Sequence, residues 1–480
     1  MAIIEDSELI DQLKDIVGPS GYREAEDIDI KNYKDMMGAR SIKPPLLLRP
    51  QSTQEVSQIL RACNDAKQPI TPQGGMTGLV SGAAPLGGEI VLSFERMKQV
   101  VEVDKFTSTM TVQAGVELQT IQETAEENNL LFPLDLGARG SCTIGGNLAT
   151  NAGGNRVIRY GMIRDMVIGV EAVLADGSVI EGLHKLRKNN TGYDLKQLFI
   201  GSEGTLGVIT KAVLKLAPKP NSQAVALCGV KSFDEVANFL VHAQSSLGSN
   251  LSAFEVLWNN TYALIDEYVP SVNVPLPDSY GFYVLIESMG SNTERDLELF
   301  LDCLNHANEQ GLIEEVVVAD SDAKIKKIWD VRDGAAEVIG AGYMHAFDVS
   351  LNIDAMGYFG EEVEKRIREK FEDTTIGLFG HVGDGNVHII VNVGPETRNV
   401  HLDIDEIVYA LIKELNGSIS AEHGIGIMKK QFLNYSKSDP EIGLMKTLKQ
   451  TMDPNGICLL YTSDAADDTP CVDLGGRRII

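Results

Sequence analysis

Three histidines and one glutamate stand in two short motifs that are far apart in the chain. His381 and His388 flank Val-Gly-Asp-Gly-Asn-Val, and Glu422 and His423 lie in Ser-Ala-Glu-His-Gly-Ile-Gly. The Gly-Asp-Gly turn lets the chain reverse, so His388 can return toward His381. Two imidazoles and one carboxylate form a ligand set for Zn²⁺ or a related divalent metal with open coordination positions. The spacing alone also fits histidines that form hydrogen bonds within a turn.

A further candidate for chemistry is Arg332, in Trp329-Asp330-Val331-Arg332, which reads as part of a helix. A guanidinium at this place could form a bidentate pair with a substrate carboxylate. The other interpretation is an arginine that faces solvent. The residue pattern leaves these two interpretations open.

Three stretches rich in glycine and small residues lie in the first half of the chain, at residues 72–78, 136–154 and 201–210. Loops of this kind can bring backbone amides close to phosphate oxygens, because no Cβ intervenes. None has the Gly-x-Gly-x-x-Gly spacing or the P-loop Lys-Ser/Thr, so the usual dinucleotide and nucleoside-triphosphate motifs are excluded. Each stretch alone fits a turn without a ligand. Three together indicate a long, extended ligand such as a dinucleotide.

The order of these stretches resembles the vanillyl-alcohol-oxidase type of FAD-binding domain, also called the PCMH type. The motifs that carry the resemblance are Pro-Gln-Gly-Gly-x-Thr-Gly, Gly-Gly-Asn-x-Ala-Thr-Asn-Ala-Gly-Gly and Gly-Ser-Glu-Gly-Thr-Leu-Gly-Val-Ile-Thr. Within that superfamily, residues 40–457 are similar to the D-2-hydroxyacid dehydrogenases. This group includes D-2-hydroxyglutarate dehydrogenase, D-lactate dehydrogenase and the flavin subunit of glycolate oxidase.

The resemblance implies an α+β fold with a PCMH-type FAD-binding domain, a ferredoxin-like α+β substrate or cap domain, and a short C-terminal helical segment. It also implies that residues 73–78 hold the FAD pyrophosphate and that the two later stretches line the isoalloxazine and adenine. Some relatives attach FAD through a histidine in the first loop, which here has none, so we expect non-covalent FAD. The expected FAD-binding residues are Pro72, Gln73, Gly74, Gly75, Thr77, Gly78, Leu136, Gly137, Ser141, Gly145, Gly146, Asn147, Thr150, Asn151, Gly153, Gly154, Glu203, Gly204, Gly207, Val208 and Ile209.

The resemblance further assigns roles to the residues of the two histidine motifs. His381, His388 and Glu422 become metal ligands, His423 the general base, and Asn386 a polar substrate contact. Arg332 becomes the partner of the substrate carboxylate. The implied reaction is the oxidation of a D-2-hydroxyacid to the 2-oxoacid, with hydride transfer to flavin N5. Electrons would leave through a quinone, a cytochrome or an electron-transfer flavoprotein.

The substrate itself is less clearly indicated. Relatives specific for dicarboxylates carry further Thr and Lys contacts shortly after the arginine, and here Ala335-Ala336 and residues 343–348 have neither. This departure leaves lactate, glycolate or a bulkier apolar 2-hydroxyacid as candidates. His345 could compensate as a substrate contact, or face solvent from a strand. The competing functions are a metal-dependent hydrolase and a non-catalytic flavin subunit of a complex similar to glycolate oxidase.

Charge and composition narrow the classes of partner. The chain has 480 residues, with 42 Lys and Arg against 68 Asp and Glu, and a formal charge of −26. Such a surface repels phosphate backbones and anionic lipid, so we expect no nucleic-acid partner. Neither a transmembrane segment nor a signal peptide is evident, which favours a cytoplasmic enzyme, and a homodimer is compatible with the sequence. The six cysteines show no paired spacing and are expected to be buried apolar side chains.

The elements that position these residues follow from periodicity and turn signals. We expect an N-terminal helical segment at 1–40, the FAD-binding domain at 41–220, the cap domain at 221–415, and at 416–457 a segment that returns to the flavin. Pro218-Lys219-Pro220 marks the boundary between the two domains, and we find no internal repeat. Residues 458–480 resemble a translated sequencing adapter, and we expect them not to be native.

Overall fold

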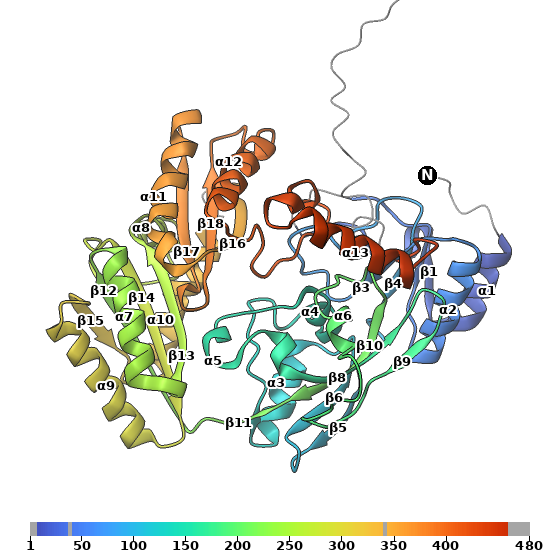
Figure 1. Cartoon of the computed structure of the whole chain (residues 1–480), viewed down its shortest axis with the longest axis horizontal. Coiled ribbons are helices and arrows are strands. Elements are labelled where there is room, and N and C mark those ends of the chain that lie inside the picture. Colours follow the sequence, from blue (N-terminus) through green and yellow to red (C-terminus); the bar gives the residue numbers. More distant parts are fainter. Residues whose placement is uncertain (1–6, 37–40, 339–342, 459–480) are drawn as a thin grey trace, which may run out of the picture.

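The computed structural model describes residues 7–36, 41–338 and 343–458, which form two lobes joined by the connection that follows β11 (Figure 1). We call residues 7–218 the N-terminal lobe and residues 222–418 the C-terminal lobe. The start of the chain lies outside the described residues. So do residues 459–480, which make up most of the proposed adapter segment. No helix in the described part of the chain has both the length and the apolar composition of a membrane span.

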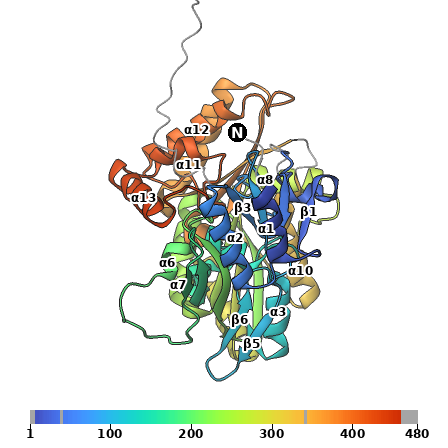
Figure 2. The same ribbon diagram turned by 90° about the vertical axis from the view of Figure 1, so that its right-hand side faces the viewer.

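The N-terminal lobe contains two larger sheets, each with its own apolar core, and one short two-stranded sheet. Helices α1 and α2 lie side by side against the first sheet (Figure 2). Ser52 caps the N-terminus of α2 by accepting a hydrogen bond from the backbone N–H of Glu55. The elements of the first sheet are β1 (Tyr22–Glu24), β2 (Leu46–Leu48), β4 (Ile90–Ser93) and β3 (Ile70–Gln73), in that order, with α1 (Ser7–Val17) and α2 (Thr53–Asp65).

The second sheet carries the loops with the glycine-rich stretches. The third stretch ends in its central strand, β10, and the second contains a short helix, α4, that the sequence analysis did not predict. The strands, in spatial order, are β5 (Val100–Asp104), β6 (Thr109–Gln113), β10 (Val208–Lys215), β8 (Val167–Val173) and β9 (Val179–Glu181). The helices are α3 (Leu118–Glu127), α4 (Ile144–Thr150), α5 (Val157–Tyr160) and α6 (Lys196–Phe199). β7 (Leu130–Leu131) pairs with β11 (Ala217–Pro218) beside the sheet.

One antiparallel sheet of seven strands forms the C-terminal lobe, in the order β15-β12-β14-β13-β17-β18-β16. Its first part is β12 (Ser222–Val230), α7 (Phe233–Leu247), β13 (Leu251–Trp258), α8 (Asn259–Tyr268), β14 (Phe282–Gly290), α9 (Thr293–Glu309) and β15 (Glu315–Val318). After α10 (Asp322–Glu337), its second part is β16 (His345–Ser350), α11 (Ile353–Lys370), β17 (Thr375–Gly380), β18 (Asn386–Asn392) and α12 (His401–Glu414).

Both parts of this sheet repeat the ferredoxin-like order strand-helix-strand-strand-helix-strand. In the first part α8 is inserted before the third strand, and in the second part a single bridge between Ser350 and Ser418 takes the place of the last strand. The two units join edge to edge where β13 pairs with β17. The two units repeat one topology, which the search of the sequence for repeats did not reveal.

Helices cover the two faces of the seven-stranded sheet unequally. α7, α9, α11 and α12 pack on one face and form the larger apolar core. α8 and α10 pack with the opposite face around Tyr262 and Tyr283. Part of that second face stays uncovered and carries Phe379, His388 and Ile390 toward the N-terminal lobe. The functional side chains lie on this part.

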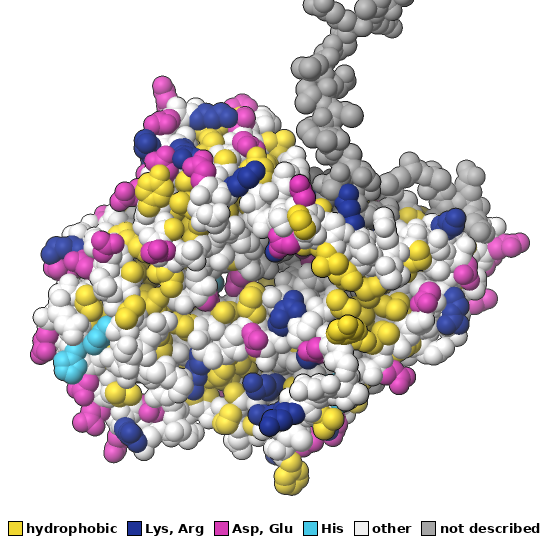
Figure 3. All heavy atoms as spheres, viewed as in Figure 1, with side chains coloured by type: hydrophobic (Ala, Val, Ile, Leu, Met, Phe, Trp, Pro, Cys, Tyr) yellow, Lys and Arg dark blue, Asp and Glu magenta, His cyan; other side chains and the backbone are white. Residues whose placement is uncertain are grey.

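The last described segment crosses back to the N-terminal lobe. α13 (Asp439–Met452) is held there by Lys449, whose buried ammonium donates to Asp453 and to the carbonyl of Thr205. Cys458, which we assigned to the non-native tail, is fully buried in the core of the first sheet, next to Cys63. All five described cysteines are buried, as predicted. Acidic side chains lie among basic ones over the face shown in Figure 3.

Candidate active site

A cavity of about 520 Å³ lies between the two lobes, and all three glycine-rich stretches line it. From the other side it is lined by Arg332, His381, His388, Glu422 and His423. The expected FAD-binding residues that line the cavity are Pro72, Gln73, Gly74, Gly75, Thr77, Gly78, Leu136, Gly137, Gly145, Gly146, Asn147, Thr150, Gly153, Gly154, Glu203, Gly204, Gly207, Val208 and Ile209. Ser141 and Asn151 are not among the lining residues. Motifs from opposite halves of the sequence thus share one cavity.

The N-terminal wall of the cavity has the features that a large polar cofactor requires. A Cβ added at Gly78 or Gly137 would meet no atom within 4 Å, so both glycines border open space. At Gly75 a Cβ would come within 2.0 Å of the Ser141 carbonyl oxygen, so this glycine lets two loops approach each other. The buried Oγ1 of Thr143 and Oδ1 of Asn147 have no hydrogen-bond partner within the described chain. Both residues line the cavity, where a ligand could satisfy these atoms.

On the C-terminal wall, a buried carboxylate joins two of the predicted site residues. Glu255, in the middle of β13, accepts from Arg332 Nε at 2.8 Å and from His381 Nδ1 at 2.6 Å. Burial acts to raise the pKa of Glu255, but His381 and Arg332 hold that pKa below its ordinary value. Burial likewise acts to lower the pKa of His381, but Glu255 outweighs it and raises that pKa to about 9. Nε2 of His381 lies 3.1 Å from Nη2 of Arg332, so a metal ion bound at this nitrogen would have to displace that contact.

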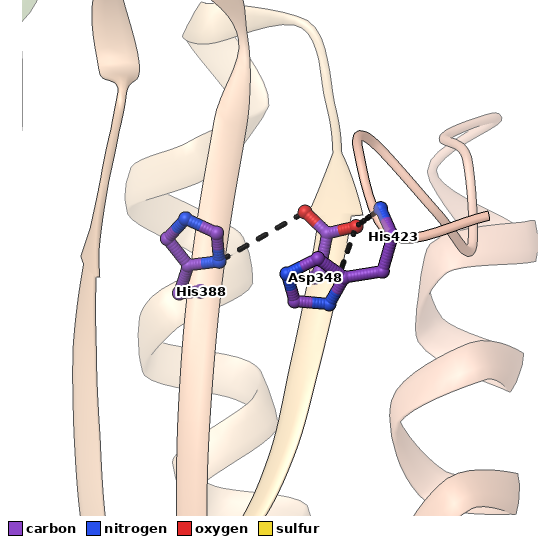
Figure 4. Close-up of side chains that lie close together, drawn as sticks. All are labelled: Asp348, His388 and His423. Atoms are coloured by element: carbon purple, nitrogen blue, oxygen red, sulfur yellow. Dashed lines mark hydrogen bonds and ion pairs between the residues drawn. The ribbon is translucent and has the colours of Figure 1, made fainter. Parts of the chain in front are cut away.

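A second buried carboxylate, Asp348 on β16, lies between the other two histidines (Figure 4). Its oxygens are each 3.8 Å from a ring nitrogen, one from Nδ1 of His388 and one from Nδ1 of His423. Burial acts to raise the pKa of Asp348, but His423, Lys429 and His388 hold it well below its ordinary value. Burial lowers the pKa of His388, so its imidazole is neutral. A neutral imidazole is the form that binds a metal.

We call residues 420–426 the connecting segment. Its backbone N–H groups donate hydrogen bonds to one carboxylate from each lobe. Asp348 Oδ2 accepts from the backbone N–H groups of residues 421, 422 and 423, at 3.1, 2.8 and 2.9 Å. Glu203, in the N-terminal lobe, accepts from the backbone N–H groups of residues 425 and 426, both at 2.9 Å. The side chain of Glu422 accepts from Gly154 N–H at 2.7 Å, and a Cβ at Gly153 would clash with it. Glu422 therefore reaches the cavity at the glycine-rich wall.

Two overlapping sets of side chains could hold a metal ion. In each set the possible ligand atoms lie within 4.8 Å of one another: His381, His388 and Glu422 in one, and Asp348, His388 and His423 in the other. Asp348 already accepts several hydrogen bonds, including one from the amide of Asn386 at 2.7 Å. The first set is the one that the sequence predicted, although His381 also contacts Glu255 and Arg332, and Glu422 accepts from Gly154. Its two imidazoles and one carboxylate suit Zn²⁺ or another transition metal.

Two buried acids of this site, Glu255 and Asp348, were not identified from the sequence. Each is a single acidic residue inside an otherwise apolar strand, Leu-Ser-Ala-Phe-Glu-Val-Leu-Trp and His-Ala-Phe-Asp-Val-Ser. Because charged side chains are rarely buried without a partner, that pattern was an available signal.

Two other predicted residues lie away from the cavity. Asn386 is buried behind it against Asp348, so its role as a substrate contact stays a prediction. His345 is neither a cavity residue nor exposed to solvent. It is buried, and its Nε2 pairs with Asp405 of α12 at 2.6 Å.

Comparison with known proteins assigns the same two parts of the chain to one family. Residues 44–182 match the model of the FAD binding domain, and residues 219–459 match that of the C-terminal domain of FAD linked oxidases. The chain belongs to the FAD-linked oxidase family. It is an FAD-linked dehydrogenase of the D-2-hydroxyacid type, and FAD is the cofactor of its family.

Relatives of known name are similar over nearly the whole chain. A putative mitochondrial D-lactate dehydrogenase of Schizosaccharomyces pombe is 41% identical, over 95% of this chain and 87% of the relative. The mitochondrial D-2-hydroxyglutarate dehydrogenase of Danio rerio is 41% identical, over 87% of this chain and 78% of the relative. The mitochondrial location of these relatives gives no support to the cytoplasmic location that we predicted.

A solved structure confirms the fold class. p-Cresol methylhydroxylase with substrate bound is 16% identical and aligns with a TM-score of 0.77, over 96% of this chain and 98% of the other. This likeness shows the fold alone. The α+β fold of the PCMH type is therefore as predicted.

The position of Asp348 leads to a test of how the connecting segment is held. In Asp348→Asn, a buried acceptor for several N–H groups would become an amide whose NH₂ must face one of those donors. We expect the free energy of unfolding to fall by about 3 kcal/mol, because charged hydrogen bonds are lost and buried donors are left unpaired. Chemical denaturation of the FAD-bound protein would measure the change. Asp373→Asn, at an exposed site, is the matched control, and an equal effect of both changes would contradict this role of Asp348.

Proposed function

We propose that this chain oxidises a D-2-hydroxyacid to the 2-oxoacid, with FAD as the hydride acceptor and a divalent metal bound by His381, His388 and Glu422. The observation that carries the proposal is that these three side chains face the same cavity as the glycine-rich stretches. When bound, FAD supplies a hydride acceptor at N5, and the metal lowers the pKa of the substrate hydroxyl.

Arg332 is the residue we propose for binding the substrate carboxylate. Its Nε donates to Glu255, which fixes the guanidinium plane, and its Nη2 lies 3.1 Å from Nε2 of His381, so a substrate carboxylate would share the terminal nitrogens with that imidazole. Burial acts to lower the pKa of Arg332, but Glu255 outweighs it and raises that pKa, so the side chain stays cationic. A fixed, charged guanidinium at the cavity suits bidentate binding of a carboxylate.

His423 is the residue we propose as the general base. Its side chain is a quarter exposed, it lines the cavity, and its backbone N–H is fixed by Asp348. An imidazole can take the proton of the substrate hydroxyl near neutral pH, and Asp348 would stabilise the imidazolium that forms. His381 and His388 are more deeply buried than His423. His388 already has the neutral form of a ligand, whereas a metal bound at His381 would replace the proton that Glu255 stabilises there.

Three further features belong to the proposal. FAD is bound non-covalently, because the first glycine-rich loop has no histidine. Electrons leave through a quinone, a cytochrome or an electron-transfer flavoprotein. A hydrolase of the same metal site is not supported, because the family binds FAD. A non-catalytic flavin subunit is the alternative that the following experiment decides.

The reaction is tested by anaerobic reduction of the purified, FAD-bound protein. We expect a D-2-hydroxyacid to bleach the flavin absorbance near 450 nm, and removal of the metal with a chelator to abolish bleaching. D-Lactate, D-2-hydroxyglutarate and glycolate are the first substrates to compare. Bleaching that persists in full after chelation would contradict the metal site. A bound flavin that no 2-hydroxyacid reduces would favour the non-catalytic subunit.

The role of His423 is tested by His423→Ala. We expect the variant to keep FAD and metal but to lose about 10²- to 10⁴-fold in the rate of flavin reduction, the usual contribution of a general base. The control is His306→Ala, which removes an exposed histidine on α9. Flavin reduction by His423→Ala at the rate of the parent would show that another residue takes the proton.

A further inference from the structure

We infer that the substrate carries an apolar side chain and that the enzyme selects against a second carboxylate. This inference rests on the proposed function, because it concerns the part of the same cavity next to Arg332 and the histidines. The observations that carry it are the register of three strands, the face of α10 and the charges of the residues that line the cavity.

The register of β17, β18 and β16 places an apolar row beside the histidine row. Phe379, His388 and Asp348 lie opposite one another on the three strands. Two residues along each strand, on the same face of the sheet, Gly377, Ile390 and Ala346 form the next row. Ile390 and Ala346 both line the cavity. A substrate held at His388 therefore has an alkyl surface on one side.

The helix α10 provides the opposite wall of the same region. Ala335 and Ala336 follow Arg332 by three and four residues, so all three share one helical face, and all three line the cavity. Met344 completes the wall and, with Ile390, is almost fully buried in the core beneath it. Ala336 and Ala346 are exposed toward the cavity. Their small side chains leave room for a substrate chain longer than a methyl group.

The charges of this region would not balance a second carboxylate. Among the described residues that line the cavity, Arg332 is the only lysine or arginine. It is already paired with Glu255, and the carboxylate of Asp333 lies 3.9 Å from its Nη1. Asp135 and Glu422 also line the cavity. With Arg332 on the first carboxylate, a second one beside the apolar row would lose its hydration without gaining a lysine or arginine partner, because the proposed metal ion lies at the histidine row and binds the hydroxyl end of the substrate.

A matched pair of five-carbon substrates separates the two side-chain types. Anaerobic stopped-flow reduction of the FAD- and metal-loaded protein would give the ratio of rate to dissociation constant for each. We expect this ratio to be about 100-fold or more higher for D-2-hydroxypentanoate than for D-2-hydroxyglutarate, because a buried carboxylate would lack a partner. We expect the ratio for D-2-hydroxypentanoate to be about 15-fold higher than for D-lactate, because each of the two added methylenes contributes about fourfold.

The outcomes distinguish this inference from the function on which it rests. Reduction by D-2-hydroxyglutarate as fast as or faster than by D-2-hydroxypentanoate would overturn the inference and leave the proposed function intact. Flavin reduction by none of the three acids would overturn both. A preference for D-lactate over D-2-hydroxypentanoate would also overturn the inference, because it would show that the alkyl surface does not contact the substrate.

Ala346→Lys tests the place of the subsite independently. A lysine at this position would add a cation to the apolar row, and we expect the ratio of the two five-carbon substrates to shift toward D-2-hydroxyglutarate by about 10-fold or more. Ala346→Leu is the control, because it adds comparable bulk without charge and should slow both substrates without favouring the diacid. An unchanged ratio in a flavin-loaded Ala346→Lys protein would show that the side-chain subsite lies elsewhere.

Discussion

The connecting segment, residues 420–426, has backbone N–H groups that two carboxylates from different lobes must satisfy. Asp348 holds its first half and Glu203 its second half, while the Glu422 side chain binds the backbone of Gly154. Glu422 and His423 can therefore occupy the cavity only when both lobes bind the connecting segment as they do in this structure. An acceptor lost from either lobe would leave buried donors unpaired, which is costly at low dielectric constant. The candidate active site thus depends on the docking of the lobes.

Deep burial of acidic groups explains the arrangement of the remaining side chains. Glu255 and Asp348 are at most 2% exposed, and each is compensated by residues that also face the cavity. Glu255 orients Arg332 and one imidazole, and Asp348 lies between the other two imidazoles. A carboxylate behind a ligand histidine fixes the ring and its tautomer, and such partners commonly change metal affinity by about 10- to 100-fold. In the proposed function these acids orient the imidazoles that bind the metal ion, and Glu255 orients Arg332 for the substrate carboxylate.

Most of the residues singled out in the sequence line one cavity in the structure, while their roles stay predictions. The glycine-rich stretches and the histidine motifs combine uncommon residue types at close spacing, so a chemical role could be proposed for them from the sequence alone. β12 and β13 are buried on both faces, so their sequences lack the alternation that reveals a half-exposed strand. Glu255 lies in β13 and Asp348 in β16, and neither received a role from the sequence. The partner of His345 is contributed by α12, so only tertiary structure could reveal that pair.

The most direct test is a titration of the chelator-treated, FAD-loaded protein with Zn²⁺ or Mn²⁺. Our account predicts one ion per chain, loss of tight binding in His388→Ala, and an affinity about 10- to 100-fold lower in Glu255→Gln, because its imidazole would lose the fixed orientation. Flavin absorbance in each variant would show that the cavity remains intact. Binding of no ion by the parent protein, or equal affinity in the parent and His388→Ala, would contradict the account.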